Sequence, residues 1–132
     1  MKIDTAEATD WRQLREFAAV DLDKSFIISW HLEAGSLMID VDLFLTAEHP
    51  SYEEPRPAEK VCIRTAIIEF PYCEKLSAED DTSSSMTDLV EDLGHGVIEG
   101  LRRHVDGRYE INGEFGTVFV AAERPLVRLK AP

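Results

Sequence analysis

Apolar and polar side chains alternate most regularly in two neighbouring segments, residues 25–33 and 37–46. Alternation with a period of two is typical of strands that bury one face, so each segment predicts a strand. The link between them contains Gly35, which can take the positive φ of a tight turn. Pairing Leu32 with Leu37 across that turn sets the register of a hairpin. The apolar pairs that follow are Trp30 with Ile39, Ile28 with Val41, and Phe26 with Leu43.

Residues 60–70 are rich in β-branched side chains and predict a third strand, which Pro71 ends. Its alternation is less regular, and apolar side chains would face both sides, so we expect both faces to be covered. Cys62 lies inside this apolar segment and is interpreted as a small core residue. A disulfide between Cys62 and Cys73 is an open alternative that a reducing compartment disfavours.

A second hairpin signal lies in the C-terminal third of the chain, at Asn112 and Gly113. This dipeptide suits the two positive φ values of a type I′ turn. The pairs that it predicts are Ile111 with Glu114 and Tyr109 with Gly116, and Val118 and Val120 are expected on the same face as Tyr109. Residues 126–130 predict a last short strand. Residues 97–105 fit both a helix and a strand, and we favour a strand or a short irregular element.

Two helices are expected outside these strands. The first lies within residues 1–20 and is capped by Thr9 or Asp10. Its spacing predicts an apolar stripe formed by Trp11, Leu14, Phe17 and Ala18. Residues 77–96 combine a serine-rich acidic loop with one short helix capped by Thr87.

These elements predict a mainly β (α+β) domain over residues 1–132. We expect an antiparallel β-sandwich or a strongly curled sheet of about six to seven strands, with an N-terminal helix and one short second helix. Its sections are the N-terminal helix (1–20), the first hairpin with the third strand (24–70), the acidic loop with the short helix (77–96), and the C-terminal hairpin with the last strand (97–132).

The charge is strongly and unevenly negative. The 26 acidic and 14 basic side chains give a net charge of −12 at pH 7. Residues 1–99 carry 22 acidic and 8 basic side chains, whereas residues 100–132 carry 4 and 6. Such a surface repels phosphate backbones, so the charge argues against nucleic-acid binding. It is compatible with a basic protein partner or with metal ions, and it also serves solubility alone.

Segments that would direct the chain to a membrane are not expected. The longest apolar segments fall short of the ~18 residues that a membrane span needs. The N-terminal residues lack the basic-then-apolar pattern of a signal peptide. The sequence therefore predicts a cytoplasmic protein without membrane contact.

Motifs that would support catalysis are not evident in the sequence. It contains no glycine-rich phosphate loop, no nucleophile elbow, no histidine pair at helical metal spacing and no paired cysteine motif. We therefore name no catalytic residue and no cofactor, and we expect a function other than catalysis. One alternative is a metal-binding group on the polar face of the first hairpin, formed by His31, Asp40 and Asp42. Alternate polar residues also mark the solvated face of any antiparallel sheet.

The long connection LTAEHPSYEEPRPAEK, residues 45–60, follows the first hairpin. Its three prolines bias the preceding residues toward extended conformations, so the loop is expected to be stiff. Long ordered loops often carry function. The predicted partner-binding residues are His49, Tyr52, Glu53, Glu54 and Arg56. The alternative is a connection that only shields the sheet.

Three functional hypotheses follow. The first is a non-enzymatic protein-interaction domain of the bacterial cytosol that binds a basic partner, as an inhibitor or an immunity protein against a nuclease would. The second is a small metal-dependent enzyme or ligand-binding domain that uses His31, Asp40 and Asp42. The third is a homodimer formed through the sheet, suggested by Met38 and Phe44 on the polar face. The N-terminal helix could equally cover those two side chains.

Overall fold

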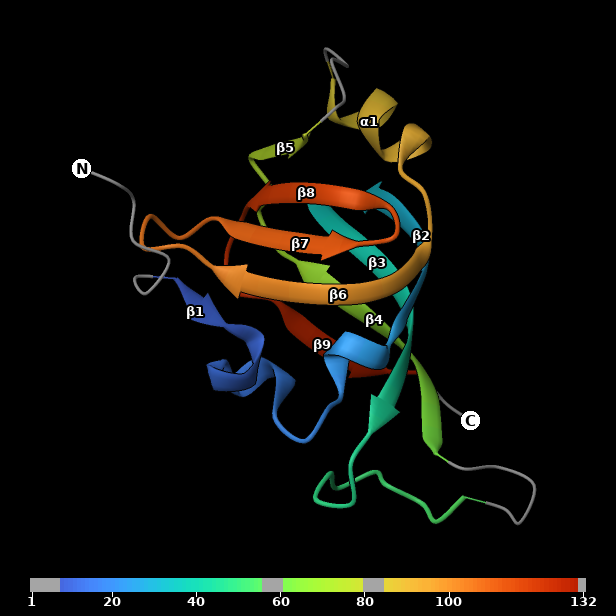
Figure 1. Cartoon of the computed structure of the whole chain (residues 1–132). Helices are drawn as coiled ribbons and strands as arrows, with labels where there is room; N and C mark the ends of the chain where they lie inside the picture. Colours follow the sequence, from blue (N-terminus) through green and yellow to red (C-terminus); the bar gives the residue numbers. More distant parts are fainter. Residues whose placement is uncertain (1–7, 56–60, 80–84, 131–132) are drawn as a thin grey trace.

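The computed structural model describes residues 8–55, 61–79 and 85–130, which form an almost entirely antiparallel β structure (Figure 1). The longer strands are β2 (Phe26–Glu33), β3 (Ser36–Leu45), β4 (Cys62–Phe70) and β6 (Gly96–Arg103). The shorter strands are β1 (Thr9–Asp10), β5 (Lys75–Ala78), β7 (Tyr109–Gly113), β8 (Gly116–Ala121) and β9 (Leu126–Leu129). One α-helix, α1 (Met86–Asp92), lies between β5 and β6.

All nine strands belong to one sheet with the order β5-β8-β7-β6-β2-β3-β4-β9, and β1 pairs with the outer part of β6. The expectation of a mainly antiparallel β domain is confirmed. The expected count of six to seven strands is too low, because β1 and β5 were not foreseen. These strands have only two and four residues, too few to show a period in the sequence. Pairing with β6 and β8 makes them strands.

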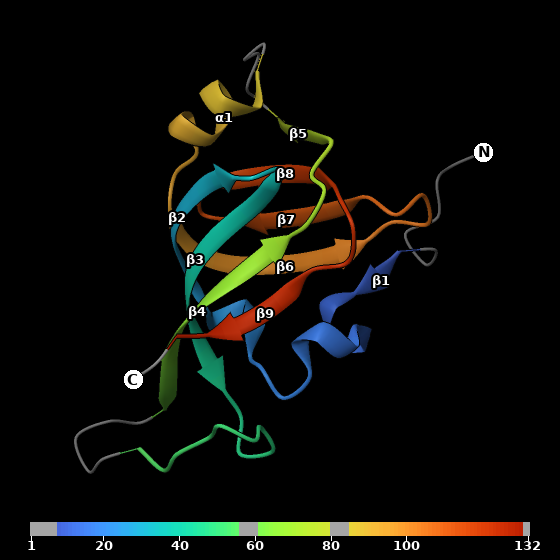
Figure 2. The same cartoon turned by 180° about the vertical axis from the view of Figure 1, so that it is seen from behind.

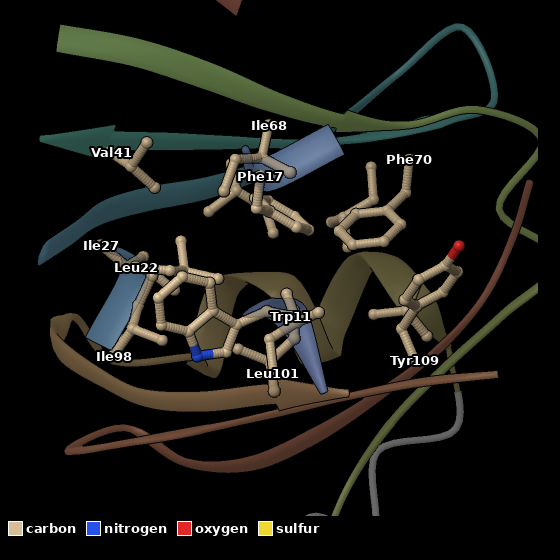
Figure 3. Packing of buried hydrophobic residues seen from close by; sticks show 14 of the residues in the cluster. Trp11, Phe17, Leu22, Ile27, Val41, Ile68, Phe70, Ile98, Leu101 and Tyr109 are labelled. Carbon is tan, nitrogen blue, oxygen red and sulfur yellow. The ribbon is translucent and has the colours of Figure 1, made fainter. Parts of the chain in front are cut away.

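The sheet folds back on itself where β2 meets β6. Only two residue pairs join these strands, Phe26 with Val97 and Ile27 with Gly96. Figures 1 and 2 show β6, β7 and β8 crossing over the layer formed by β2, β3, β4 and β9. Side chains from both parts fill the space between them (Figure 3). The rings of Phe70 and Tyr109, for example, meet edge to face at 5.1 Å.

The prediction of an N-terminal helix is wrong. The segment forms three separate 3₁₀ turns, Trp11–Gln13, Arg15–Phe17 and Leu22–Lys24. Leu14 interrupts the first two with an extended backbone at ψ 123°. Asp10 still caps the first turn by accepting a hydrogen bond from the backbone N–H of Arg12 at 3.0 Å. A helix of this length is marginal by itself, so packing between the two parts of the sheet determines the backbone.

The expected apolar stripe nevertheless enters the core. Trp11, Leu14 and Phe17 are all at most 5% exposed, and only Ala18 stays outside. The turns contact β6 on one side and β9 on the other, so the segment runs between these two strands (Figures 1 and 2). It therefore packs on the inner side of the sheet. The expectation that it covers Met38 on the outer face is wrong.

The register of the first hairpin is confirmed from the turn as far as Trp30, which pairs with Ile39. Beyond that point a β-bulge between Ile27 and Ser29 shifts the pairing. Ile27 now faces Val41 and is 1% exposed, so it takes the core position predicted for Ile28. The predicted burial of Ile28 and Phe26 is wrong, because the inserted residue turns both outward.

The predicted turn of the second hairpin is also wrong. Gly113 pairs with Gly116, so the turn consists of Glu114 and Phe115 instead of the Asn-Gly dipeptide. Contacts with β6 select this register: Glu114 Oε1 accepts a hydrogen bond from the Val97 N–H at 2.7 Å. The register of the hairpin shifts by an even number of residues, so the side chains predicted to face the core still face it. They are Tyr109, Ile111, Val118 and Val120.

The remaining elements settle several open points. Residues 97–105 fall mainly in strand β6, and the last strand β9 is present. Ser85 caps α1 instead of Thr87, because its hydroxyl accepts a hydrogen bond from the Asp88 N–H at 3.1 Å.

Cys62 and Cys73 are free thiols, and both are buried. In the part of the chain described, the helices are too short and too polar to cross a bilayer.

Candidate functional site

Large apolar side chains gather on the outer face of strands β2, β3 and β4. Phe26 is 36% exposed, Ile28 45% and Ile63 48%. The bulge in β2 turns the first two outward. On β4, Cys62 and Ala66 face the core, so the alternate residue Ile63 must face solvent. The expectation that both faces of β4 are covered is therefore wrong, and the exposed apolar patch calls for a functional explanation.

Asp42 lies at the centre of this patch. On one side it is paired with Phe26 of β2, and on the other with Thr65 of β4. Phe44, two residues further along the same face, is paired with Ile63. Among the described residues, Asp42 has neither a hydrogen-bond partner nor an ion-pair partner. We call these residues the Asp42 face: Phe26, Ile28, Asp42, Phe44, Val61 and Ile63.

Asp40, two residues before Asp42 on the same face of β3, has partners for both carboxylate oxygens. Lys130 Nζ donates to Oδ1 at 2.9 Å, and Ser29 Oγ donates to Oδ2 at 2.8 Å. His31 Nδ1 lies 3.6 Å from the same Oδ2, as the register predicted. Burial raises the pKa of Asp40, but the hydrogen bonds from Lys130 and Ser29 outweigh it and hold the pKa below its ordinary value.

The three residues of the metal hypothesis thus share one face without forming a metal site. Lys130 already neutralises Asp40, and His31 is directed to Asp40 and to Glu33, whose Oε2 lies 3.6 Å from Nε2. Within residues 8–55, 61–79 and 85–130, no three His, Cys, Asp or Glu side chains are grouped so that they could hold a metal ion. Of these three side chains, Asp42 is the one without a partner among the described residues.

The predicted binding residues in the long loop after β3 lie in different environments. His49 Nδ1 accepts a hydrogen bond from the backbone N–H of Ser51 at 3.0 Å, so this side chain stabilises its own turn. Tyr52 packs against the core and is half-buried. Glu53 and Glu54 are exposed. Arg56 lies outside the described residues. These contacts of His49 and Tyr52 stabilise the loop, and partner binding by the loop residues stays a prediction.

A second polar cluster, which the sequence did not reveal, lies on the outer face of β6 and β7. The Glu110 carboxylate is buried among three donors: Arg102 at 3.2 Å, His104 at 2.8 Å and Asn112 at 3.1 Å. Burial raises the pKa of Glu110, but the hydrogen bonds from Arg102, His104 and Asn112 outweigh this effect and hold the pKa below its ordinary value. The cluster satisfies its own hydrogen bonds, so its arrangement is structural.

This cluster makes the stability depend on pH. The pKa of Glu110 is lowered in the folded state, so its stabilisation is complete above the unfolded pKa and disappears as pH falls through the folded pKa. We expect Glu110→Gln to lower the free energy of unfolding by about 1–3 kcal/mol at neutral pH. The difference from the unmodified protein should shrink below pH 4.5. Urea denaturation over a pH series measures it, and a difference that grows on acidification would contradict the assignment.

Comparison with protein-family models, curated proteins and solved structures finds no match to this chain. The candidate site therefore depends on its own geometry. The sequence drew attention to Asp42 and Phe44, but it placed Phe26 and Ile28 in the core. Their exposure follows from the bulge in β2, and no residue pattern in the sequence signals that bulge.

Proposed function

We propose that this chain is a protein-binding domain that holds a basic partner on the Asp42 face. The observation that carries the proposal is a carboxylate without a partner among the described residues, surrounded by exposed apolar side chains. Protein interfaces combine an apolar centre with a few well-placed charges. An inhibitor or immunity protein directed at a basic enzyme, such as a nuclease of the bacterial cytoplasm, is a function of this kind.

The chemistry of Asp42 indicates what the partner must present. A partner that docks on the apolar side chains of the Asp42 face would remove water from the Asp42 carboxylate. An unpaired buried charge costs several kcal/mol, so the partner must place an Arg or Lys there. Arg is the better match, because its planar guanidinium can donate two parallel hydrogen bonds to a carboxylate.

The neighbouring carboxylates favour the same assignment. Asp40 is paired with Lys130 at 2.9 Å, and Glu69 with Arg128 at 2.8 Å. Among the described residues, these pairs leave Asp42 as the carboxylate of β3 and β4 that has no ion-pair partner. The net charge of −12 adds a long-range attraction for basic proteins and raises the rate of encounter.

We expect Asp42→Asn to weaken binding of arginine-centred peptides about tenfold, the loss of one charge-assisted hydrogen bond. The probes are short peptides with one Arg between aliphatic and aromatic residues, together with the same peptides carrying citrulline in place of Arg. Binding is measured by fluorescence anisotropy at low salt. Asp88→Asn, which removes an exposed Asp on α1, is the matched control and should bind like the unmodified protein.

Amide chemical shifts then locate the peptide. They should move on the outer residues of β2, β3 and β4, and Ile63→Thr should reduce the effect while Leu126→Thr, on the exposed edge strand β9, should not. Equal binding of Arg and citrulline peptides would contradict the proposal. A homodimer detected by sedimentation that becomes tighter in Asp42→Asn would identify a second copy of the chain as the occupant instead.

A further inference from the structure

A hollow of about 660 Å³ opens at the end of the sheet remote from the hairpin turn of β7 and β8. Three connections surround it: those between β4 and β5, between β6 and β7, and between β8 and β9. They contribute Tyr72, Arg108 and Arg124, respectively. Its volume lies within the range of small-molecule sites, and none of its lining residues belongs to the Asp42 face.

Two polar atoms in the wall of this hollow are buried, the hydroxyl of the buried Tyr109 and the Nε of the half-buried Arg103. Tyr109 and Arg103 are directly paired across the hairpin of β6 and β7. Tyr109 is 1% exposed. Among the described residues, neither the Tyr109 hydroxyl nor the Arg103 Nε makes a hydrogen bond of normal geometry, although Arg103 lies close enough to the hydroxyl to lower its pKa. Buried polar groups are nearly always paired in native proteins, so a ligand that accepts hydrogen bonds here would remove a cost.

Three arginines line the hollow, and among the described residues Arg103 is the one without an ion-pair partner. Arg108 is paired with Asp106 at 2.9 Å, and Arg124 Nη2 donates to Glu16 at 3.0 Å. In the part of the chain described, Arg103 forms no ion pair with a carboxylate. Its guanidinium lies close to the β6–β7 connection. Arg103 Nη2 is 3.6 Å from the position that a Cβ on Gly107 would occupy. A free cation in a chain of net charge −12 indicates an anionic ligand.

Tyr109 adds a neutral donor beside this cation. Burial raises the pKa of its hydroxyl, against the opposing effect of Arg103 and Arg124. The phenol therefore keeps its proton at neutral pH and can donate a hydrogen bond to an anion. A phenol and a guanidinium together match the two oxygens of a carboxylate.

We propose that this hollow binds a small organic monocarboxylate. Its carboxylate accepts hydrogen bonds from Tyr109 and Arg103, and its apolar part extends toward Tyr72, a lining residue that is 77% exposed. Glu74, Asp106 and Glu123 also line the hollow. They repel a second negative charge, so a monoanion fits better than a phosphate. This site is separate from the proposed protein-binding face.

The test measures binding of benzoate, hexanoate and inorganic phosphate to the full chain, at equal ionic strength against chloride. Calorimetry gives the affinity, and thermal unfolding gives the shift in midpoint, because a ligand of the native state must raise it. The variants are Tyr109→Phe and Arg103→Gln. Arg128→Gln, which removes an arginine from the outer face, is the matched control.

We expect at least one carboxylate to raise the unfolding midpoint more than phosphate does. Arg103→Gln should weaken its binding about tenfold or more, and Tyr109→Phe about fivefold, while Arg128→Gln leaves it unchanged. Tyr109→Phe should unfold at or above the midpoint of the unmodified protein without ligand, since it deletes an unsatisfied hydroxyl.

The amide shifts caused by the carboxylate should fall on residues 103–109 and 121–124, the walls of the hollow. The proposal is overturned if no carboxylate raises the midpoint above the chloride control. It is equally overturned if Tyr109→Phe folds normally and binds with full affinity, or if the shifts appear on β2–β4. The last result would assign the anion to another surface.

Discussion

Replacing Phe17 by alanine is expected to lower the free energy of unfolding by about 3–5 kcal/mol, the largest loss that we expect from any single change considered. Phe17 is 2% exposed and lies in the core between the two parts of the sheet (Figure 3). Its 3₁₀ turn contacts β9, and the preceding turn contacts β6. Removing the ring leaves a cavity where the N-terminal segment joins these strands. Urea denaturation followed by tryptophan fluorescence measures the loss.

The neighbouring Ala18 provides the control for this result. It is exposed, so Ala18→Ser should change the free energy of unfolding by no more than about 0.5 kcal/mol. If Phe17→Ala were equally neutral, the N-terminal segment would not be part of the core. The 3₁₀ arrangement of residues 11–24 would then be wrong.

Gly113→Ala is expected to lower the free energy of unfolding by about 1–3 kcal/mol through overpacking. A Cβ at this position would lie 2.5 Å from the Val97 carbonyl oxygen and against the Phe115 ring. The backbone of β6 cannot move away without weakening its hydrogen bonds to the turn, where the Glu114 N–H donates to that same Val97 oxygen at 3.2 Å. Chemical denaturation of the purified variant tests the expectation.

Two further glycines distinguish crowding from backbone strain. Gly100, in the neighbouring strand β6, has open space around its Cβ position, so Gly100→Ala should be neutral or slightly stabilising. Gly116 also has open space, but its φ of +102° is strained for any L side chain, so Gly116→Ala should cost about 1–2 kcal/mol. A stabilising Gly116→Ala would favour the Asn-Gly turn that the sequence predicted.

The two proposed sites use different parts of the same sheet. The protein-binding face lies on the outer side of β2, β3 and β4. The carboxylate site lies at the end of the sheet, among the connections that β4, β6 and β8 lead into. Variants of Asp42 and Arg103 therefore separate the two functions, because neither side chain contributes to the other site.

Sequence periodicity alone determined several parts of this molecule. The first turn and the pairing of Leu32 with Leu37 follow from alternation around Gly35. The buried set of the second hairpin was also right despite the wrong turn, because an even shift of register keeps each side chain on its face. The proximity of His31 to Asp40 followed from the same pairing.

Tertiary contacts decided the rest. The bulge that exposes Phe26 allows Ile27 to reach the core where β2 joins β6, and no local pattern encodes that junction. The turn at Glu114 depends on its hydrogen bond to Val97 on another strand. The N-terminal segment adopts 3₁₀ turns because it must fit between β6 and β9.

Both candidate sites depend on tertiary contacts that the sequence pattern does not reveal. Among the described residues Asp42 has no partner, whereas Lys130, 90 residues further along the chain, neutralises Asp40. Tyr109 and Arg103 became a candidate site only when three distant connections closed around them. Local alternation determines which face of a strand a residue takes. Contacts between residues far apart in the chain determine which polar groups are left without a partner, and these decided both proposals.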